Sequence, residues 1–167
     1  SQNDQFHDLI LHHSFHDKLD GDPIYVIDEY LKQVAIDHKE EKKKAIAEGK
    51  HHFKGAVFID APKDFITVKK EQNELFCQGW QLSDHDDAIL KITLDDKELK
   101  NIERKNRQDV FEAYQEVYAG DLDPDTIGWK TNIDLMDLEL GNHKLLVQCL
   151  EPNGNILAEK SIQFVLE

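Results

Sequence analysis

The sequence predicts an α+β protein in which a helical N-terminal segment precedes an antiparallel β-sandwich. Two stretches favour the sandwich: Gly79-Trp80 ends one strand-like run, and Gly128-Trp129 opens another. Glycine admits a neighbouring backbone and tryptophan buries a large rigid surface, so we expect both pairs in core strands with both indoles inward. Near residue 53 helical spacing changes to short strand-like runs, which predicts two parts, residues 1–52 and 53–167.

Residues 1–52 are predicted to form a helical hairpin. Residues 4–17 show helical spacing, and after a break a second helix begins near Pro23 and runs to about residue 48, where Gly49 ends it. The second helix carries a narrow apolar stripe. The stripe consists of Ile24, Ile27, Leu31, Val34, His38 and Ala45. Such a stripe needs a partner, and the candidates are the first helix, a second copy of the chain (a homo-oligomer) or an upstream domain.

The remainder of the chain is predicted to consist of short strands separated by turn residues. The predicted strands are residues 56–59, 65–68, 74–82, 88–94, 97–102, 126–134, 143–150 and 155–166. Asp95-Asp96 predicts a tight turn within one hairpin, and Pro152-Asn153-Gly154 predicts the turn of the last one. Residues 106–118 return to helical spacing and predict a short helix or an irregular crossover. Strands of this length and spacing are typical of a sandwich.

The composition excludes some classes of partner. The chain has 167 residues, of which 34 are acidic and 20 basic, for a net charge of −14. This field repels nucleic acid and anionic membrane surfaces, so we expect no nucleic-acid partner. No apolar run approaches the ~20 residues of a membrane span. The polar start has no signal-peptide pattern, and its abruptness suggests a piece cut from a longer protein.

The two cysteines, Cys77 and Cys149, each lie in a predicted strand. We expect two buried free thiols, because cysteine is among the most buried residue types. The alternative is a bridge between the two sheets. Neither thiol is a candidate nucleophile, since no cationic residue or helix start lies nearby in the sequence.

From Leu75 to the C-terminus, six motifs follow one another in a recognisable order. They are Gly79-Trp80, Leu94-Asp95-Asp96, Arg107-Gln108-Asp109-Val110, Gly128-Trp129, Gly141-Asn142-His143 and Asn153-Gly154. This order resembles an immunoglobulin-like module of bacterial cell-envelope proteins, similar to modules that accompany glycosyltransferases and other proteins of surface polysaccharide synthesis. The family pattern often has proline where Gln108 stands and phenylalanine where Trp129 stands.

The resemblance implies a non-catalytic accessory domain rather than an enzyme. Its function would be to position a catalytic domain, with an upstream domain of the same protein as one candidate, or to contact glycan or a protein partner. The location implied is the cytoplasmic face of the bacterial membrane or the cell envelope. No cofactor is implied.

Aromatic residues are the first candidates for ligand contact, because a sugar ring has an apolar side that stacks on an exposed aromatic ring. Tyr114 and Tyr118, on the predicted crossover, are expected to be exposed. Trp129 is a further candidate, although its strand position, like that of Trp80, favours core packing. Arg107 with Asp109 is expected to brace the crossover through hydrogen bonds to the backbone, and a polar contact of Arg107 with ligand is the alternative.

Metal binding is a further alternative. His12 and His16 lie one turn apart on the first predicted helix, as a metal pair would, and they would serve a metal-dependent enzyme. Two ligands on one helix do not close a site, so a polar helix face is the simpler interpretation.

An acidic stretch begins like a calcium loop. It comprises Asp121, Asp123 and Asp125, but Thr126 and Asn132 stand where an EF-hand needs glycine and glutamate. An EF-hand is therefore rejected. A looser calcium site shared with Asp84, Asp86 and Asp87 is the alternative to the simpler interpretation, which is that these are acidic turns.

Overall fold

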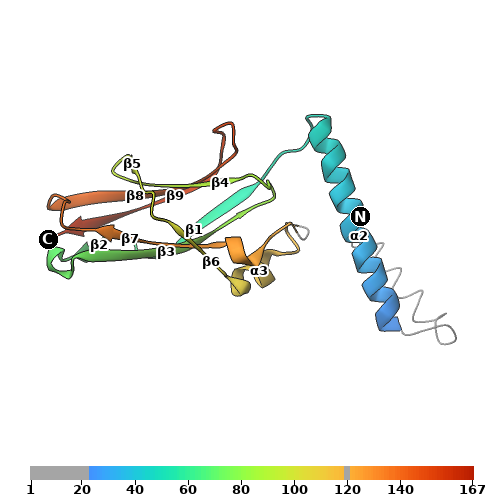
Figure 1. Cartoon of the computed structure of the whole chain (residues 1–167), viewed down its shortest axis with the longest axis horizontal. Helices are drawn as coiled ribbons and strands as arrows, with labels where there is room; N and C mark the ends of the chain where they lie inside the picture. The colour runs from blue at the N-terminus through green and yellow to red at the C-terminus, as the bar shows by residue number, and fades with distance from the viewer. Residues whose placement is uncertain (1–22, 119–120) are drawn as a thin grey trace. The chain divides into compact units, whose positions relative to one another are not determined.

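A computed structural model describes residues 23–118 and 121–167 (Figure 1). The chain divides into two compact units, residues 1–51 and residues 52–167. The first unit contributes helix α2 (Pro23–Ala47), and residues 52–167 are called the two-sheet body below. The predicted helix over residues 4–17, and with it the helical hairpin, lies outside the described residues.

Helix α2 confirms the second predicted helix and ends one residue before the expected position. Gly49 follows with a φ of +70°, and its N–H donates to the carbonyl of Ile46 at 3.0 Å. A glycine in this conformation is a common way to end a helix, because no Cβ opposes it. Leu31 of the predicted stripe is 47% exposed. Among the described residues, no helix has the length and apolar character that crossing a membrane requires.

The two-sheet body contains nine strands and three short helices among its described residues. They are β1 (Gly55–Ala61), β2 (Ile66–Val68), η1 (Lys70–Gln72), β3 (Glu74–Ser83), β4 (Ile89–Leu94), β5 (Lys97–Glu98), β6 (Glu103–Lys105), α3 (Gln108–Tyr114), η2 (Pro124–Thr126), β7 (Gly128–Asp134), β8 (Gly141–Leu150) and β9 (Ile156–Leu166). One sheet has the order β1-β3-β7-β6 and the other β2-β9-β8-β4-β5. All neighbours are antiparallel except β2 and β9, which are parallel, whereas the sequence predicted only antiparallel pairing.

The two sheets form two layers around one shared core (Figure 1). Each sheet contributes alternate residues to it, as the two-residue period of a strand requires. Buried members include Cys77 and Trp129 from the first sheet and Ile92, Val147 and Phe164 from the second. A separate, smaller cluster joins β3 to α3 and includes Leu82 and Val110. Helix α3 therefore packs on the outer face of the first sheet.

The two Gly-Trp pairs lie opposite each other in reverse order. Antiparallel β3 and β7 place Gly79 opposite Trp129 and Trp80 opposite Gly128. Trp129 is fully buried between the sheets, and a Cβ at Gly79 would lie 2.6 Å from its ring atom Cζ2 and 2.0 Å from the carbonyl oxygen of Phe58. Close backbone approach at Gly79 is thus confirmed. The prediction that both indoles point inward is wrong, because neighbouring residues of a strand face opposite sides and Trp80 faces outward under α3.

The predicted hairpin around Asp95-Asp96 is confirmed, but its second strand is much shorter than residues 97–102. Asp95 and Asp96 have φ values of +49° and +68°, as a two-residue hairpin turn needs. β5 then spans only two residues, and the N–H of Leu99 still donates to Ile92 at 2.8 Å. Beyond Leu99 the chain crosses to the other sheet, where it becomes β6.

His143 connects three segments at the same end of the body as this turn. Its ring is 8% exposed, with Nδ1 at 2.5 Å from Asp95 Oδ2 and Nε2 at 2.6 Å from the carbonyl oxygen of Glu139. Both partners are acceptors, so only the imidazolium form, with two N–H groups, satisfies both contacts. Burial alone lowers the pKa of His143, but the bonds to Asp95 and Glu139 outweigh it and the pKa is raised overall.

Cys77 and Cys149 are both free and fully buried, which confirms the expected thiols and excludes a bridge between the sheets. The two sulfur atoms have different neighbours: Cys77 Sγ contacts the carbonyl of Leu75, and Cys149 Sγ contacts that of Leu82, seven residues further along β3. Burial raises the pKa of Cys77 to about 12. Such a thiol is a poor nucleophile at neutral pH.

Candidate functional site

An aromatic row crosses the outer face of the first sheet and ends at α3. Phe58 of β1 and Trp80 of β3 are register partners, with ring centroids 5.5 Å apart and planes at 17°. Tyr114, the last residue of α3, packs on Trp80 at 5.6 Å and 40°. Lys160 places its ammonium 4.3 Å from the centre of the Phe58 ring. The row therefore consists of a cation and three rings in contact, and Tyr114 is its most exposed ring at 38%.

Arg107 fixes α3 to the same face of the sheet. Its Nη1 bonds Asp60 Oδ2 at 2.6 Å, and its Nε and Nη2 bond the two carboxylate oxygens of Asp109 at 3.0 Å each. Gly128 makes room for this side chain, because a Cβ there would lie 2.7 Å from Arg107 Cγ. The hydrogen bond from Arg107 lowers the pKa of Asp109 to about 2, and the bonds to Asp109 and Asp60 raise the pKa of Arg107.

The geometry of Arg107 therefore supports the expected role, in which Arg107 braces the crossover, over a contact with ligand. Its partners are two carboxylates, not the backbone groups that the sequence suggested. The guanidinium fork is occupied on both sides, and bidentate pairing of this kind is geometrically specific. A direct contact of Arg107 with ligand would be limited to the two N–H groups that these three bonds leave.

Two candidate ligand residues are buried: this corrects the expected exposure of Tyr118 and confirms the core packing that the strand position of Trp129 favoured. Tyr118 is 5% exposed, because it packs with Val110 and Ile127 beneath the segment that was expected to display it. Lys54 lies over its ring at 4.9 Å, and burial raises the pKa of Tyr118 to about 12. Trp129 lies in the core between the sheets. Neither ring offers a face to a sugar, whereas Tyr114 is exposed as expected.

The metal candidates have separate outcomes. His12 and His16 lie outside the described residues. Within residues 23–118 and 121–167, no group of three or more His, Cys, Asp or Glu side chains is placed to hold a metal ion. Asp123 Oδ1 instead accepts the N–H of Asp125 at 3.0 Å, and Asp125 Oδ1 accepts from the amide of Asn106 at 2.8 Å. These two aspartates stabilise the turn that begins η2, as acidic turn residues commonly do.

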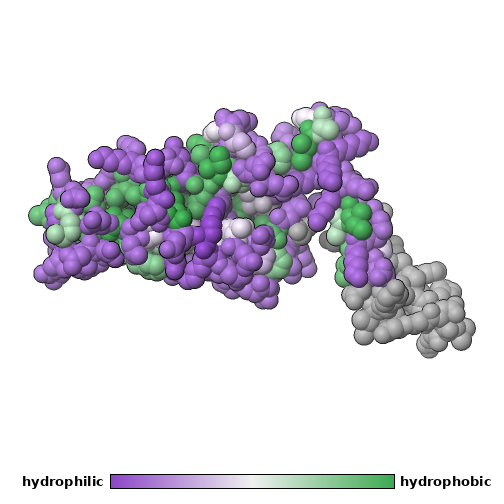
Figure 2. Space-filling model, viewed as in Figure 1, coloured by the Kyte–Doolittle hydropathy of each residue, from purple (hydrophilic) through white to green (hydrophobic). Residues whose placement is uncertain are grey.

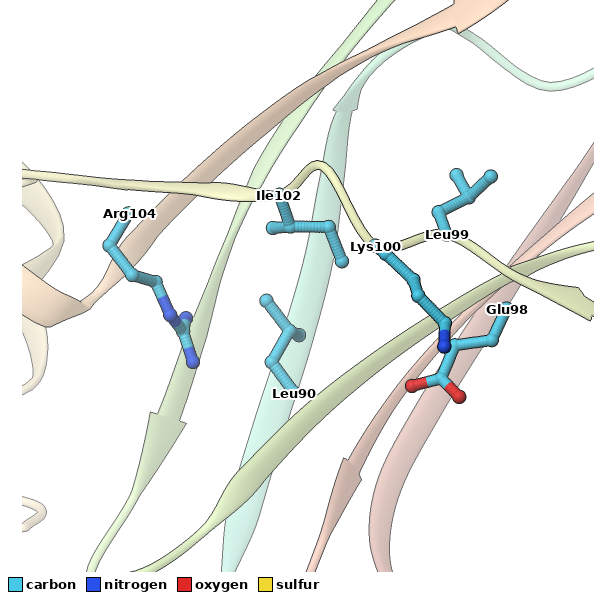
Figure 3. Close-up of a pocket in the computed structure, with 6 residues that line it drawn as sticks. All are labelled: Leu90, Glu98, Leu99, Lys100, Ile102 and Arg104. Atoms are coloured by element: carbon cyan, nitrogen blue, oxygen red, sulfur yellow. The ribbon is translucent and has the colours of Figure 1, made fainter.

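A hollow of about 420 Å³ opens at the edge of the body where the chain crosses from β5 to β6. Six residues line it: Leu90, Glu98, Leu99, Lys100, Ile102 and Arg104. Figure 3 shows Leu90 and Ile102 between Arg104 on one side and the charged ends of Lys100 and Glu98 on the other. In the view of Figure 2, hydrophobic areas of the body are set among mostly hydrophilic surface. The hollow combines an apolar floor with a charged rim.

Arg104 stands between this hollow and a second one of about 400 Å³, which is lined in part by Gln81, Asp86 and Asp123. Its Nη2 donates to Gln81 Oε1 at 2.8 Å and its Nη1 to the carbonyl of Thr126 at 3.3 Å. Burial lowers the pKa of Arg104. Sequence reasoning missed Arg104, because it lies between Glu103 and Lys105 in a run that is typical of solvated surface.

Comparison with known proteins does not assign the chain to a family. No family model matches the chain, and no curated protein matches it. Among solved structures, the chain is similar to the endo-beta-1,4-mannanase from Thermotoga petrophila with 13% sequence identity and a TM-score of 0.44. The match covers 70% of this chain and 20% of that one, so the chain spans about a fifth of the mannanase.

Proposed function

We propose that this chain is a non-catalytic accessory module of a bacterial cell-envelope or glycan-synthesis protein, and that it contacts glycan through the exposed end of the aromatic row. The observation that carries the proposal is that the ring of Tyr114 is both fixed and exposed. Its ring is held in place by Trp80 and is still 38% exposed. A fixed, exposed ring suits stacking against the apolar side of a sugar, since little side-chain freedom is lost on binding.

Polar groups around the ring support the same assignment. Asp109, Glu112 and Gln115 are exposed on α3 or directly after it. Carboxylate and amide groups accept and donate hydrogen bonds to hydroxyl groups, which a glycan supplies in number. The ring and its polar neighbours are mounted on a helix that Arg107 ties to the sheet, and a rigid support of this kind favours binding.

The strand order supports an immunoglobulin-like fold for the module. The order of neighbouring strands in one sheet, β1-β3-β7-β6, corresponds to strands A, B, E and D of an immunoglobulin domain, and β9-β8-β4 in the other corresponds to G, F and C. β5 then takes the place of the additional C′ strand that variable-type domains have beside C. The family proposed from the motifs and the fold proposed from the strand order thus agree.

The test is a substitution at the exposed ring. Tyr114→Ala should weaken binding to a responsive polysaccharide about tenfold, because it removes the stacking surface. Binding is measured by a screen of bacterial surface polysaccharides followed by calorimetry, with the melting temperature as a check on folding. Phe76→Ala is the matched control, since Phe76 is an aromatic residue 44% exposed elsewhere on β3. Equal losses in both variants, or no binding to any polysaccharide, would contradict the proposal.

Helix α2 favours a second candidate function, self-association. Leu31 on the predicted stripe is 47% exposed, although leucine in a helix usually faces a partner. In this case Leu31→Glu should shift the chain to a monomer in sedimentation velocity experiments. Gln33→Glu adds the same charge on the other side of the helix and should leave association unchanged. A wild-type chain that is monomeric at all accessible concentrations would remove this candidate.

A further inference from the structure

The hollow beside β4 contains a cation without a carboxylate partner. Arg104 is an exposed residue whose guanidinium is partly buried against Gln81, and its two hydrogen bonds go to the neutral oxygens of Gln81 and Thr126. Among the described residues no carboxylate lies within 4.0 Å of it, whereas Arg107 holds two. A guanidinium has five N–H donors, so three of them are left for another acceptor. The chain has two arginines, and of these Arg107 is paired with carboxylates whereas Arg104 is paired with none of the described ones.

The floor of the hollow is aliphatic. Leu90, Leu99 and Ile102 are half-buried and pack against the main core. Figure 3 shows Leu90 and Ile102 beside the guanidinium, so an acidic group and an apolar group of one ligand can bind at the same time. The described residues that line the hollow include no aromatic ring, which makes it a poor platform for a sugar. Its volume of about 420 Å³ falls within the range of small-ligand sites.

One strand edge is open beside the floor. β4 pairs with β5 only at Thr93 and Leu94, and Leu99 adds one bond to Ile92. Residues 89–91 therefore have no strand neighbour on this side among the described residues, although Gln81 Nε2 donates to the carbonyl of Ile89 at 3.2 Å. An extended peptide can add to such an edge through its own backbone groups.

We propose that this hollow binds an extended peptide that ends in an aliphatic residue, with the peptide carboxylate on Arg104 and the aliphatic side chain on Leu90 and Ile102. The site uses none of the residues assigned to glycan contact and does not depend on that assignment. Arg104 supplies the charge-assisted bonds, which are the stronger and more directional ones, and the aliphatic floor selects the side chain.

The experiment compares two probes on the full chain. Acetyl-Ala-Ala-Leu with a free carboxylate and the same peptide with a C-terminal amide are titrated in turn, and backbone NMR shifts report the site. The acid should bind with shifts centred on Leu90, Ile102 and Arg104, and the amide should bind at least about tenfold more weakly. Galacturonate is titrated as a third probe, because an acidic sugar offers the carboxylate without the aliphatic group.

Two variants test the anchor. Arg104→Gln should weaken binding of the acid at least about tenfold. Lys130→Gln removes the same charge from a site ion-paired with Glu103 at 3.3 Å on the neighbouring strand, and it should leave binding unchanged. The comparison therefore separates a local bond from the overall field of the chain. If Arg104→Gln does not fold, the difference in affinity between the acid and the amide for the wild-type chain still tests whether the carboxylate is bound.

Several results would overturn the proposal. These are equal affinity for acid and amide, tighter binding of galacturonate than of the peptide acid, shifts centred elsewhere, equal losses in both variants, or no binding of the acid at about 10 mM. Weak amide binding together with selective loss in Arg104→Gln would support it.

Discussion

Gly79→Ala is expected to destabilise the two-sheet body by about 3 kcal/mol or more, which places it at the upper end of overpacking substitutions. The added Cβ would lie 2.0 Å from the carbonyl oxygen of Phe58 and 2.6 Å from Trp129 Cζ2. The indole is surrounded by core residues and β1 is held in the sheet, so neither can move aside without loss of packing or pairing. Urea denaturation followed by tryptophan fluorescence measures the effect.

Gly55→Ala is the matched control for this substitution. A Cβ there would be 3.0 Å from Cys149 Sγ and 3.0 Å from Leu157 Cβ, both side-chain atoms, and 3.4 Å from the nearest backbone oxygen. The cost should therefore be clearly smaller than at Gly79. Trp129→Phe should not rescue Gly79→Ala, because the carbonyl of Phe58 remains in place. A rescue would mean that the indole alone excludes the side chain.

His143→Gln is expected to destabilise the body by about 2 kcal/mol or more near pH 6, and by less near pH 9. The pKa of His143 is raised in the folded state, so the contribution of the imidazolium is fully present below the unfolded pKa of about 6.5. It is lost as the pH rises through the folded pKa, because the neutral ring can donate only one hydrogen bond to its two acceptors. Urea denaturation of wild type and variant at both pH values measures the difference.

Two further variants separate the imidazolium from general effects of histidine. Asp95→Asn removes the carboxylate partner and should bring the pKa of His143 down, which an NMR titration of the ring detects. His52→Gln removes an exposed histidine at the start of the body and should leave the pH dependence unchanged. If the stability difference between wild type and His143→Gln were the same at both pH values, the charged form would not be the one that the fold uses.

The strands were predictable because alternation and turn residues are local properties. The run from Glu74 and the turn at Asp95-Asp96 could be assigned from neighbouring residues alone. Which face of the sheet each side chain occupies was not predictable in the same way. Trp80 was placed in the core because the sequence does not state the register between β3 and β7, and the register decides which indole meets which face.

The site residues show the same limit. Tyr114 and Tyr118 lie four residues apart in one helically spaced segment, yet one is exposed and the other is buried under the segment's own contacts. Periodicity shows which residues share a side, but not what lies beneath them. Arg104 was missed because its significance depends on the absence of a nearby carboxylate, which is a property of the folded surroundings and not of the adjacent residues.

The reversed pairing of the two Gly-Trp pairs also bears on how the strands find their alignment. A slip of β7 against β3 by two residues would keep every side chain on its own face, so alternation alone does not prevent it. Such a slip would set Trp129 opposite Cys77 or Gln81 instead of Gly79, and Trp80 opposite Thr126 or Lys130 instead of Gly128. Each indole would then face a side chain instead of a glycine, and neither would have room. A wrong alignment is therefore penalised on both faces of the sheet, which favours a single native pairing during folding.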